Sequence, residues 1–202
     1  MMRNLLMILM IAVVIAGCQS EPTGVTEADN IESEAVGNEV SGLAVVNGEP
    51  IYQEEVDQLK QQMQENESVI LEQLIAQKLL LQEAEKQGIQ VRDQKAEEQI
   101  STLLQEQGMT VQGFKSQVGA RYETILEQQK DQIMLKKLAA QSANLSVSDQ
   151  ELQMVFEQNS FENMTYSQVE PQLREMIKQQ KEQQVLGQLA QQLRSDAEIE
   201  YN

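Results

Sequence analysis

The sequence predicts a mainly α-helical, multi-helix domain with a small β element at its two ends. Most of the chain after residue 52 carries apolar side chains at helical spacing, and capping residues and glycines separate the runs. Near the start, Asn47-Gly48 lies between apolar residues, as in a two-residue hairpin turn. At the close, Ala197, Ile199 and Tyr201 alternate with glutamates, which is typical of a half-buried strand.

The first 17 residues predict a lipoprotein signal peptide. Arg3 precedes an apolar run of 12 residues, LLMILMIAVVIA, which is shorter than the ~20 residues of a spanning helix. The run ends in Ile15-Ala16-Gly17-Cys18, which resembles a bacterial lipobox, although Leu is more usual than Ile15. We therefore expect Cys18 to carry the lipid. The alternative is a buried or free cysteine at the edge of an ordinary signal peptide. Cys18 is the only cysteine, so its lipidation would leave the mature chain with no thiol and no possible disulfide.

The segment after Cys18 predicts an acidic tether. Residues 19–42 contain six acidic residues, no basic ones and little apolar periodicity, a composition typical of disorder. A flexible segment of this length spans about 25–30 Å. We therefore expect residues 18–42 to hold a folded domain, residues 43–202, away from the membrane surface.

Composition excludes several function classes. The chain has no histidine, which excludes His-based acid–base catalysis, His metal ligation and Ser-His or Cys-His nucleophile pairs. Without Arg3 the mature chain has 14 basic and 32 acidic residues, a net charge of −18, which argues against nucleic acid and anionic headgroups as partners. No phosphate-binding GxxxxGK[ST] motif is present. We predict no catalytic residue, no metal and no cofactor.

The stretch LAVVNGEPIYQEEV, residues 43–56, predicts a strand, a turn and the approach to a helix. An isolated hairpin of this size is marginally stable in water. The closing strand AEIEY could pair with residues 43–47 and complete a small sheet. Such a sheet would join the two ends of the domain.

Local signals set the expected helix boundaries. Gly88 and Gly108 are expected to stop helices, Thr110 to cap one, and the Ser148–Glu151 capping box to open another. Pro171 predicts a short turn after the competing capping boxes at 165–168 and 167–170, with the last helix starting at about residue 171. Helices are expected over residues 52–66, 67–89, 93–108, 111–118, 120–143, 152–159 and 171–196. Their expected inward residues are Val56, Leu59, Met63, Ile70, Leu71, Leu74, Ile75, Leu79, Leu81, Phe114, Val118, Tyr122, Ile125, Leu126, Ile133 and Leu138.

The order of these motifs carries a family resemblance. LAVVNGEPIYQEEVDQL, LIAQKLLLQEAEKQGIQV, GMTVQGFKSQV and VSDQELQMVFEQN follow one another as in the SurA N-terminal domain family. The last segment is similar to the C-terminal segment of SurA- and PrsA-type foldases, so the resemblance covers residues 43–202. Tyr52 stands where the family often has Ser or Thr, which shifts the expected helix start by a residue or two. Only SFENMTYSQVE stands where those foldases commonly insert a parvulin domain, so the resemblance implies a chaperone body without the isomerase.

Three functions are weighed for such a domain. The leading prediction is a lipid-anchored, ATP-independent extracytoplasmic chaperone that binds unfolded or newly translocated secreted or envelope proteins, with its client-binding residues unassigned. A structural adaptor lipoprotein with one fixed partner is the alternative, and a prolyl isomerase is the third. Exchange of a terminal strand or helix would give a homodimer. The mature methionines are either client contacts or core filler: Met63, Met109, Met134, Met154, Met164 and Met176.

Overall fold

The computed structural model describes residues 42–63, 65–159, 161 and 164–202. The expected signal peptide, Cys18 and the tether lie outside these residues. The elements are β1 (Ala44–Val46), β2 (Glu49–Ile51), α1 (Gln53–Met63), α2 (Glu67–Lys86), α3 (Asp93–Glu106), α4 (Val111–Val118), α5 (Arg121–Ser142), α6 (Asp149–Gln158), α7 (Tyr166–Asp196) and β3 (Ile199–Tyr201). The predicted mainly helical class with a small β element is confirmed.

The three strands form one antiparallel sheet in which β1 lies between β2 and β3. Asn47 and Gly48 make the turn with φ of 50° and 87°, the positive values that a tight hairpin turn requires. Val46 pairs with Ile199 across the sheet. The predicted pairing of the opening hairpin with the closing strand is confirmed. The hairpin persists because its third strand arrives from the far end of the chain.

The two predicted glycine stops are also confirmed. Gly88 has a φ of 73°, and the Ile89 N–H donates to the Ala84 carbonyl at 2.9 Å. The same pattern follows α3, where the Met109 N–H donates to the Leu104 carbonyl at 2.8 Å. In both places the reversal satisfies helix-end carbonyls and turns an apolar side chain back onto the helix.

The helix starts follow their capping residues. The Thr110 hydroxyl accepts from the Gly113 N–H at 3.1 Å, as predicted. At α1 the Tyr52 N–H donates to the Glu55 carboxylate at 2.7 Å. The glutamate therefore satisfies the helix end where Tyr52 has no capping oxygen near its backbone, and α1 begins at Gln53, within the expected shift.

The predicted break before Pro171 is wrong. A single helix, α7, runs from Tyr166 to Asp196 with Pro171 inside it. The competition between capping boxes is won by Thr165, whose N–H and hydroxyl donate to Gln168 Oε1 at 2.7 and 3.0 Å. Pro171 removes one hydrogen bond, the one that would reach the Ser167 carbonyl.

Packing explains why the helix tolerates this proline. Val169 and Leu173, on either side of Pro171, are 1% and 3% exposed against α6. Burial of two such side chains contributes about 3–6 kcal/mol. This gain matches or exceeds the cost of proline in a helix interior, about 3 kcal/mol, which includes the lost backbone hydrogen bond.

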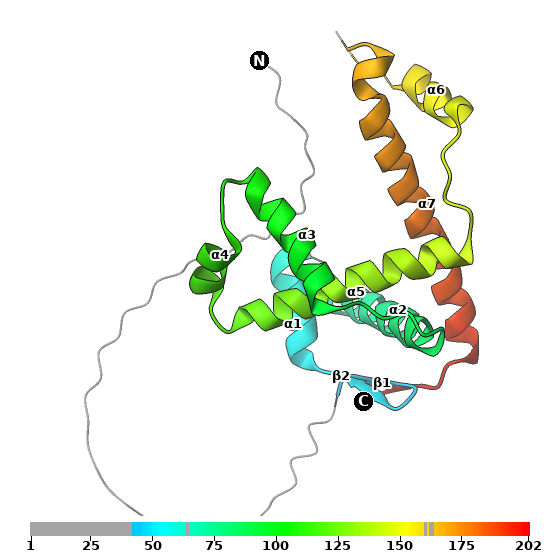
Figure 1. The fold of residues 1–202 in the computed structure, drawn as a ribbon. Coiled ribbons are helices and arrows are strands. Elements are labelled where there is room, and N and C mark those ends of the chain that lie inside the picture. Colours follow the sequence, from blue (N-terminus) through cyan, green and yellow to red (C-terminus); the bar gives the residue numbers. More distant parts are fainter. Residues whose placement is uncertain (1–41, 64, 160, 162–163) are drawn as a thin grey trace, which may run out of the picture.

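The helices pack around separate apolar clusters. The body consists of the sheet, α1, α2 and the parts of α5 and α7 that contact α2. The α3–α4 lobe, which consists of α3, α4 and the start of α5, packs around its own cluster. The α6–α7 arm, which consists of α6, the described residues of the connection after it and residues 166–178 of α7, packs around a third. The lobe and the arm extend from the body at different places (Figure 1).

Most of the predicted inward residues are buried. Leu59, Leu71, Leu74, Leu81 and Ile125 are only half-buried, and the side chain of Met63 lies outside the described part. The buried ones are Val56, Ile70, Ile75, Leu79, Phe114, Val118, Tyr122, Leu126, Ile133 and Leu138.

Within the described ranges, no helix combines the length and the apolar character needed to cross a membrane.

Candidate binding surface of the α6–α7 arm

A small apolar core joins α6 to α7 in the arm. Leu152 of α6 is fully buried, and Val169, Leu173 and Ile177 of α7 are nearly so. These α7 positions recur at intervals of four, which places them on one face of the helix. Four buried residues fix the two helices together but leave much of both surfaces accessible.

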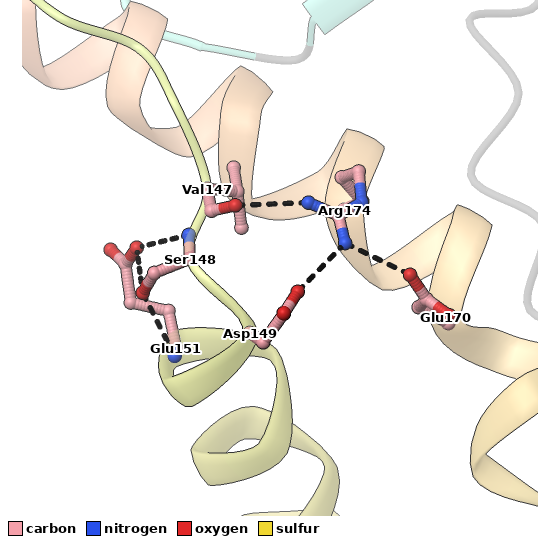
Figure 2. A network of polar contacts seen from close by, with 6 residues as sticks. All are labelled: Val147, Ser148, Asp149, Glu151, Glu170 and Arg174. Carbon is pink, nitrogen blue, oxygen red and sulfur yellow. Dashed lines mark hydrogen bonds and ion pairs between the residues drawn. The ribbon is translucent and has the colours of Figure 1, made fainter.

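A guanidinium group fixes the start of α6 against α7 (Figure 2). Arg174 donates to the Val147 carbonyl at 2.9 Å, to Asp149 Oδ1 at 3.3 Å and to Glu170 Oε1 at 2.9 Å. The Val147 bond holds the connector that enters α6, and the two carboxylates come one from each helix. Because planar guanidinium groups donate in several fixed directions, one Arg can orient all three partners.

A second cation reinforces the same junction. The Ser148 N–H and hydroxyl both donate to Glu151 Oε2 at 2.9 Å, and Glu151 N–H donates back to the hydroxyl (Figure 2). Lys181 Nζ lies 2.6 Å from Glu151 Oε1. Lys181, followed by the Ser148 hydrogen bonds, lowers the pKa of Glu151 to about 2. The predicted capping box is confirmed, and it also ties α6 to α7.

Three aromatic rings lie together at the outer end of the arm. Phe156 stacks on Phe161 with ring centroids 5.4 Å apart and meets Tyr166 edge to face, also at 5.4 Å. These spacings fall in the range that aromatic pairs favour. All three residues are only half-buried, so the cluster remains partly open to solvent.

A depression of about 650 Å³ lies between α6 and the start of α7. Its lining includes two aromatic rings, Phe156 and Tyr166, which we call the floor, and one amide and three carboxylates, which we call the rim. The full lining is Asp149, Gln153, Phe156, Glu157, Tyr166 and Glu170. Apolar rings beside a few polar groups are the usual make-up of a binding depression.

The methionines divide between core and arm. Met109 and Met134 pack against buried clusters, as core filler does. Met154, Met164 and Met176 are 50%, 41% and 47% exposed, and all three belong to α6, α7 or the connection between them. Flexible, polarisable methionine side chains suit contacts with varied apolar partners. The core interpretation is therefore confirmed for Met109 and Met134, and client contact stays a prediction for the three exposed methionines.

The sequence did not single out Phe156 or Tyr166 as binding residues. Their helices meet only after α6 folds onto α7, and no local spacing encodes that meeting. A composition signal was present, since three of the seven aromatic residues of the chain fall at Phe156, Phe161 and Tyr166. In the described part of the chain, no cluster of three or more Cys, Asp or Glu side chains is arranged to hold a metal ion.

The fold is a helical domain joined at its two ends by a small sheet, with an accessible depression on the α6–α7 arm. The SurA N-terminal domain family matches residues 41–139 of this chain, from the start of the hairpin through most of α5. The predicted resemblance to this family is therefore confirmed. The arm lies beyond the matched residues, so its surface must be interpreted from its own side chains.

Curated relatives carry chaperone and foldase names. The foldase protein PrsA of Caldanaerobacter subterraneus is 30% identical over 66% of this chain and 47% of the relative. The chaperone SurA of Pseudomonas putida is 25% identical over 54% of this chain and 30% of the relative. The chain thus spans less than half the length of these relatives.

A solved structure shares the fold. It comes from a study of PEB4 and Cj1289, two structurally related SurA-like chaperones of Campylobacter jejuni. The TM-score is 0.53 at 17% identity, and the match covers 80% of this chain and 99% of the other. At this identity the likeness concerns the fold alone.

Proposed function

We propose that the protein is an extracytoplasmic chaperone that holds unfolded or newly translocated polypeptides, works without nucleotide and is anchored by lipid at Cys18. The observation that carries the proposal is the concentration of exposed methionines and half-buried aromatic rings on the α6–α7 arm. Accessible apolar surface of this kind binds apolar segments with little sequence preference. The match to the SurA N-terminal domain family and the names of the relatives support the same role.

The net charge supports passive holding. With 32 acidic and 15 basic residues the chain carries a charge of −17, which keeps copies apart while apolar surface stays exposed. A holding mechanism of this kind needs only burial of client side chains. We expect protection to be the same with and without ATP.

The direct test is suppression of aggregation of a denatured model protein by the full chain. We expect protection at near-stoichiometric ratios and a clear loss of it in the double variant Met154→Gln/Met176→Gln. Leu103→Gln in α3 is the matched control, because Leu103 is as exposed as Met154, at 50%, but lies in the lobe. Absence of protection by the unmodified chain at every ratio would rule out the chaperone. Capture of one stoichiometric envelope protein would then support the adaptor.

The proposal excludes prolyl isomerase activity. α6 ends at Gln158 and α7 begins at Tyr166, so no domain of ordinary size, 50 residues or more, separates them. A proline-peptide assay should show no acceleration of cis–trans conversion. A rate gain that a point substitution abolishes would contradict this part of the proposal.

The lipid anchor has a separate test. Cells that express the chain are fed an alkyne fatty acid, and the protein is examined for label and for membrane association. We expect Cys18→Ser to lose both, and Ser20→Ala, two positions away in the same segment, to keep both. Label that persists in Cys18→Ser would exclude this residue as the lipid site.

A further inference from the structure

We infer that the depression on the α6–α7 arm selects client segments in which a lysine or arginine neighbours an aromatic residue. The inference rests on the proposed function and names the class of polypeptide segment that this site prefers. Three features support it: an aromatic floor, an excess of carboxylates at the rim, and a matching arrangement inside the chain itself.

The floor can take an aromatic side chain and a cation together. Phe156 and Tyr166 meet edge to face at 5.4 Å and both line the depression. A further ring can extend this cluster at similar spacing. A cation can lie over an exposed ring face, which attracts positive charge.

The rim carries more negative than positive charge. Asp149, Glu157 and Glu170 line the depression. Arg174 contacts Asp149 and Glu170. One guanidinium therefore offsets only part of the charge of three carboxylates. Burial and then the charges of Glu170 and Asp149 raise the pKa of Tyr166, so the negative potential extends to the floor.

Of the three rim carboxylates, Glu157 is the one that can still accept a cation. Its described contact is the Gln153 amide, which donates to Oε1 at 3.1 Å. Within the described residues it forms no ion pair. A client cation at the rim can therefore gain this carboxylate without breaking an existing pair.

The chain contains the same arrangement, already completed, in the α3–α4 lobe. Lys115 Nζ lies 2.8 Å from Glu97 Oε1 and 4.3 Å from the centroid of the Tyr122 ring. A lysine thus bridges a carboxylate and a tyrosine face. Among the described residues no cation lies over the Tyr166 ring of the arm. The arm presents the ring and the carboxylate, and a client would supply the cation.

Charge disfavours the other occupants of the depression. The chain's own segment 19–42 has six acidic and no basic residues, so the rim repels it. A second copy of the chain also carries a charge of −17. Charge complementarity favours a basic segment of another polypeptide.

The test measures binding of four fluorescent peptides to the full chain, kept in mild detergent, by anisotropy. The four peptides have the same length. Three of them place lysine, glutamine or glutamate next to phenylalanine, and the fourth places lysine next to alanine. We expect the phenylalanine–lysine peptide to bind about two- to fivefold more tightly than the phenylalanine–glutamine peptide, the range of one partly exposed ion pair. The glutamate and alanine peptides should bind most weakly. The lysine advantage should shrink in high salt.

A matched pair of variants locates the effect. Glu157→Gln should remove most of the lysine advantage, measured as the ratio of the affinities for the lysine and glutamine peptides. Glu175→Gln on α7 should keep the advantage. Glu175 also accepts from a glutamine four residues away but does not line the depression.

Each outcome decides. Equal binding of the lysine and glutamine peptides, or equal losses in both variants, would overturn the inference while aggregation suppression could persist. Loss of aggregation suppression in the unmodified chain would instead overturn the proposed function. A dimer in sedimentation that the lysine peptide dissociates would show that a second copy fills the depression, and would also overturn the inference.

Discussion

The α3–α4 lobe and the α6–α7 arm contain similar residues but differ in how deeply they bury their aromatic rings. Each packs a short helix against a longer one and contains a phenylalanine–tyrosine pair. In the lobe, Phe114 and Tyr122 are 6% and 5% exposed, and Lys115 covers the tyrosine ring. In the arm, Phe156 and Tyr166 stay half-buried beside a depression. The two pairs have the same residue types, so their difference in accessibility comes from how deeply each pair is buried.

The core sizes follow the same division. The lobe cluster holds eight buried residues drawn from three helices, and the arm cluster holds four drawn from two. Larger clusters contribute more to stability because each buried side chain adds about 1.5–3 kcal/mol. The smaller cluster therefore predicts that the arm is the less stable of the two regions.

The largest expected effect breaks the comparison at its aromatic pairs. Phe114→Ala should lower the free energy of unfolding by about 3–5 kcal/mol, as truncation of a buried ring does. Phe156→Ala should lower it by about 1–2 kcal/mol, because a half-buried ring loses less contact. Urea unfolding followed by circular dichroism measures both. Equal losses would mean that the arm is as closed as the lobe.

The next effect concerns the body that supports both regions. Deletion of residues 197–202 removes β3 and its pairing with β1, which should cost on the order of 2–4 kcal/mol from lost hydrogen bonds and apolar contacts. Thermal melting should show a single transition at lower temperature. An unchanged melting curve would refute a stabilising role for the sheet. Glu200→Gln, on an exposed position of the same strand, is the control expected to change little.

A smaller effect depends on pH and on the junction of the arm. Glu151 has a pKa of about 2 in the folded protein against an ordinary 4.5. Its ionised form is favoured by folding, so its contribution is complete above pH 4.5 and is lost as the pH falls towards 2. Glu151→Gln should make thermal stability less dependent on pH in this window.

The lobe offers the parallel measurement. Lys115 lowers the pKa of Glu97, so Glu97→Gln should also reduce the loss of stability in acid. Hydrogen exchange should assign the two effects, with Glu151→Gln altering peptides of α6 and Glu97→Gln altering peptides of α3. A pH profile of the Glu151 variant that matches the unmodified chain would contradict the role given to this carboxylate.

The smallest expected effect on stability sharpens the functional half of the comparison. Met154→Gln should change the free energy of unfolding by less than about 0.5 kcal/mol, because the side chain is exposed. The same substitution should weaken protection of a denatured protein. A loss of stability that matches the loss of protection would reassign Met154 to the core.

Sequence patterns predicted the parts of the fold that short stretches encode. Gly88 ends its helix because few residues other than glycine adopt positive φ without strain. Thr110 and Ser148 cap because their oxygens reach the nearby backbone N–H groups. The sheet was predictable because two period-two segments at opposite ends each lacked a partner. These signals act over a few residues and survive without knowledge of the packing.

The errors and omissions arise where packing decides. Pro171 indicated a helix break, yet contacts with α6 keep α7 continuous, and those contacts are invisible in the local sequence. The depression requires Phe156 and Tyr166 to meet across two helices, which Arg174 links through Val147, Asp149 and Glu170. No spacing rule reports which faces of two helices will meet.

The central place of β1 in the sheet also determines when the sheet can be completed during synthesis of the chain. Asn47 and Glu198, which are joined by two hydrogen bonds, stand 151 positions apart. One edge of β1 therefore stays without its partner β3 until nearly all the rest of the domain has been synthesised. Contacts this distant in sequence slow folding. A chain that leaves the cytoplasm before folding would cross the membrane before this sheet is complete.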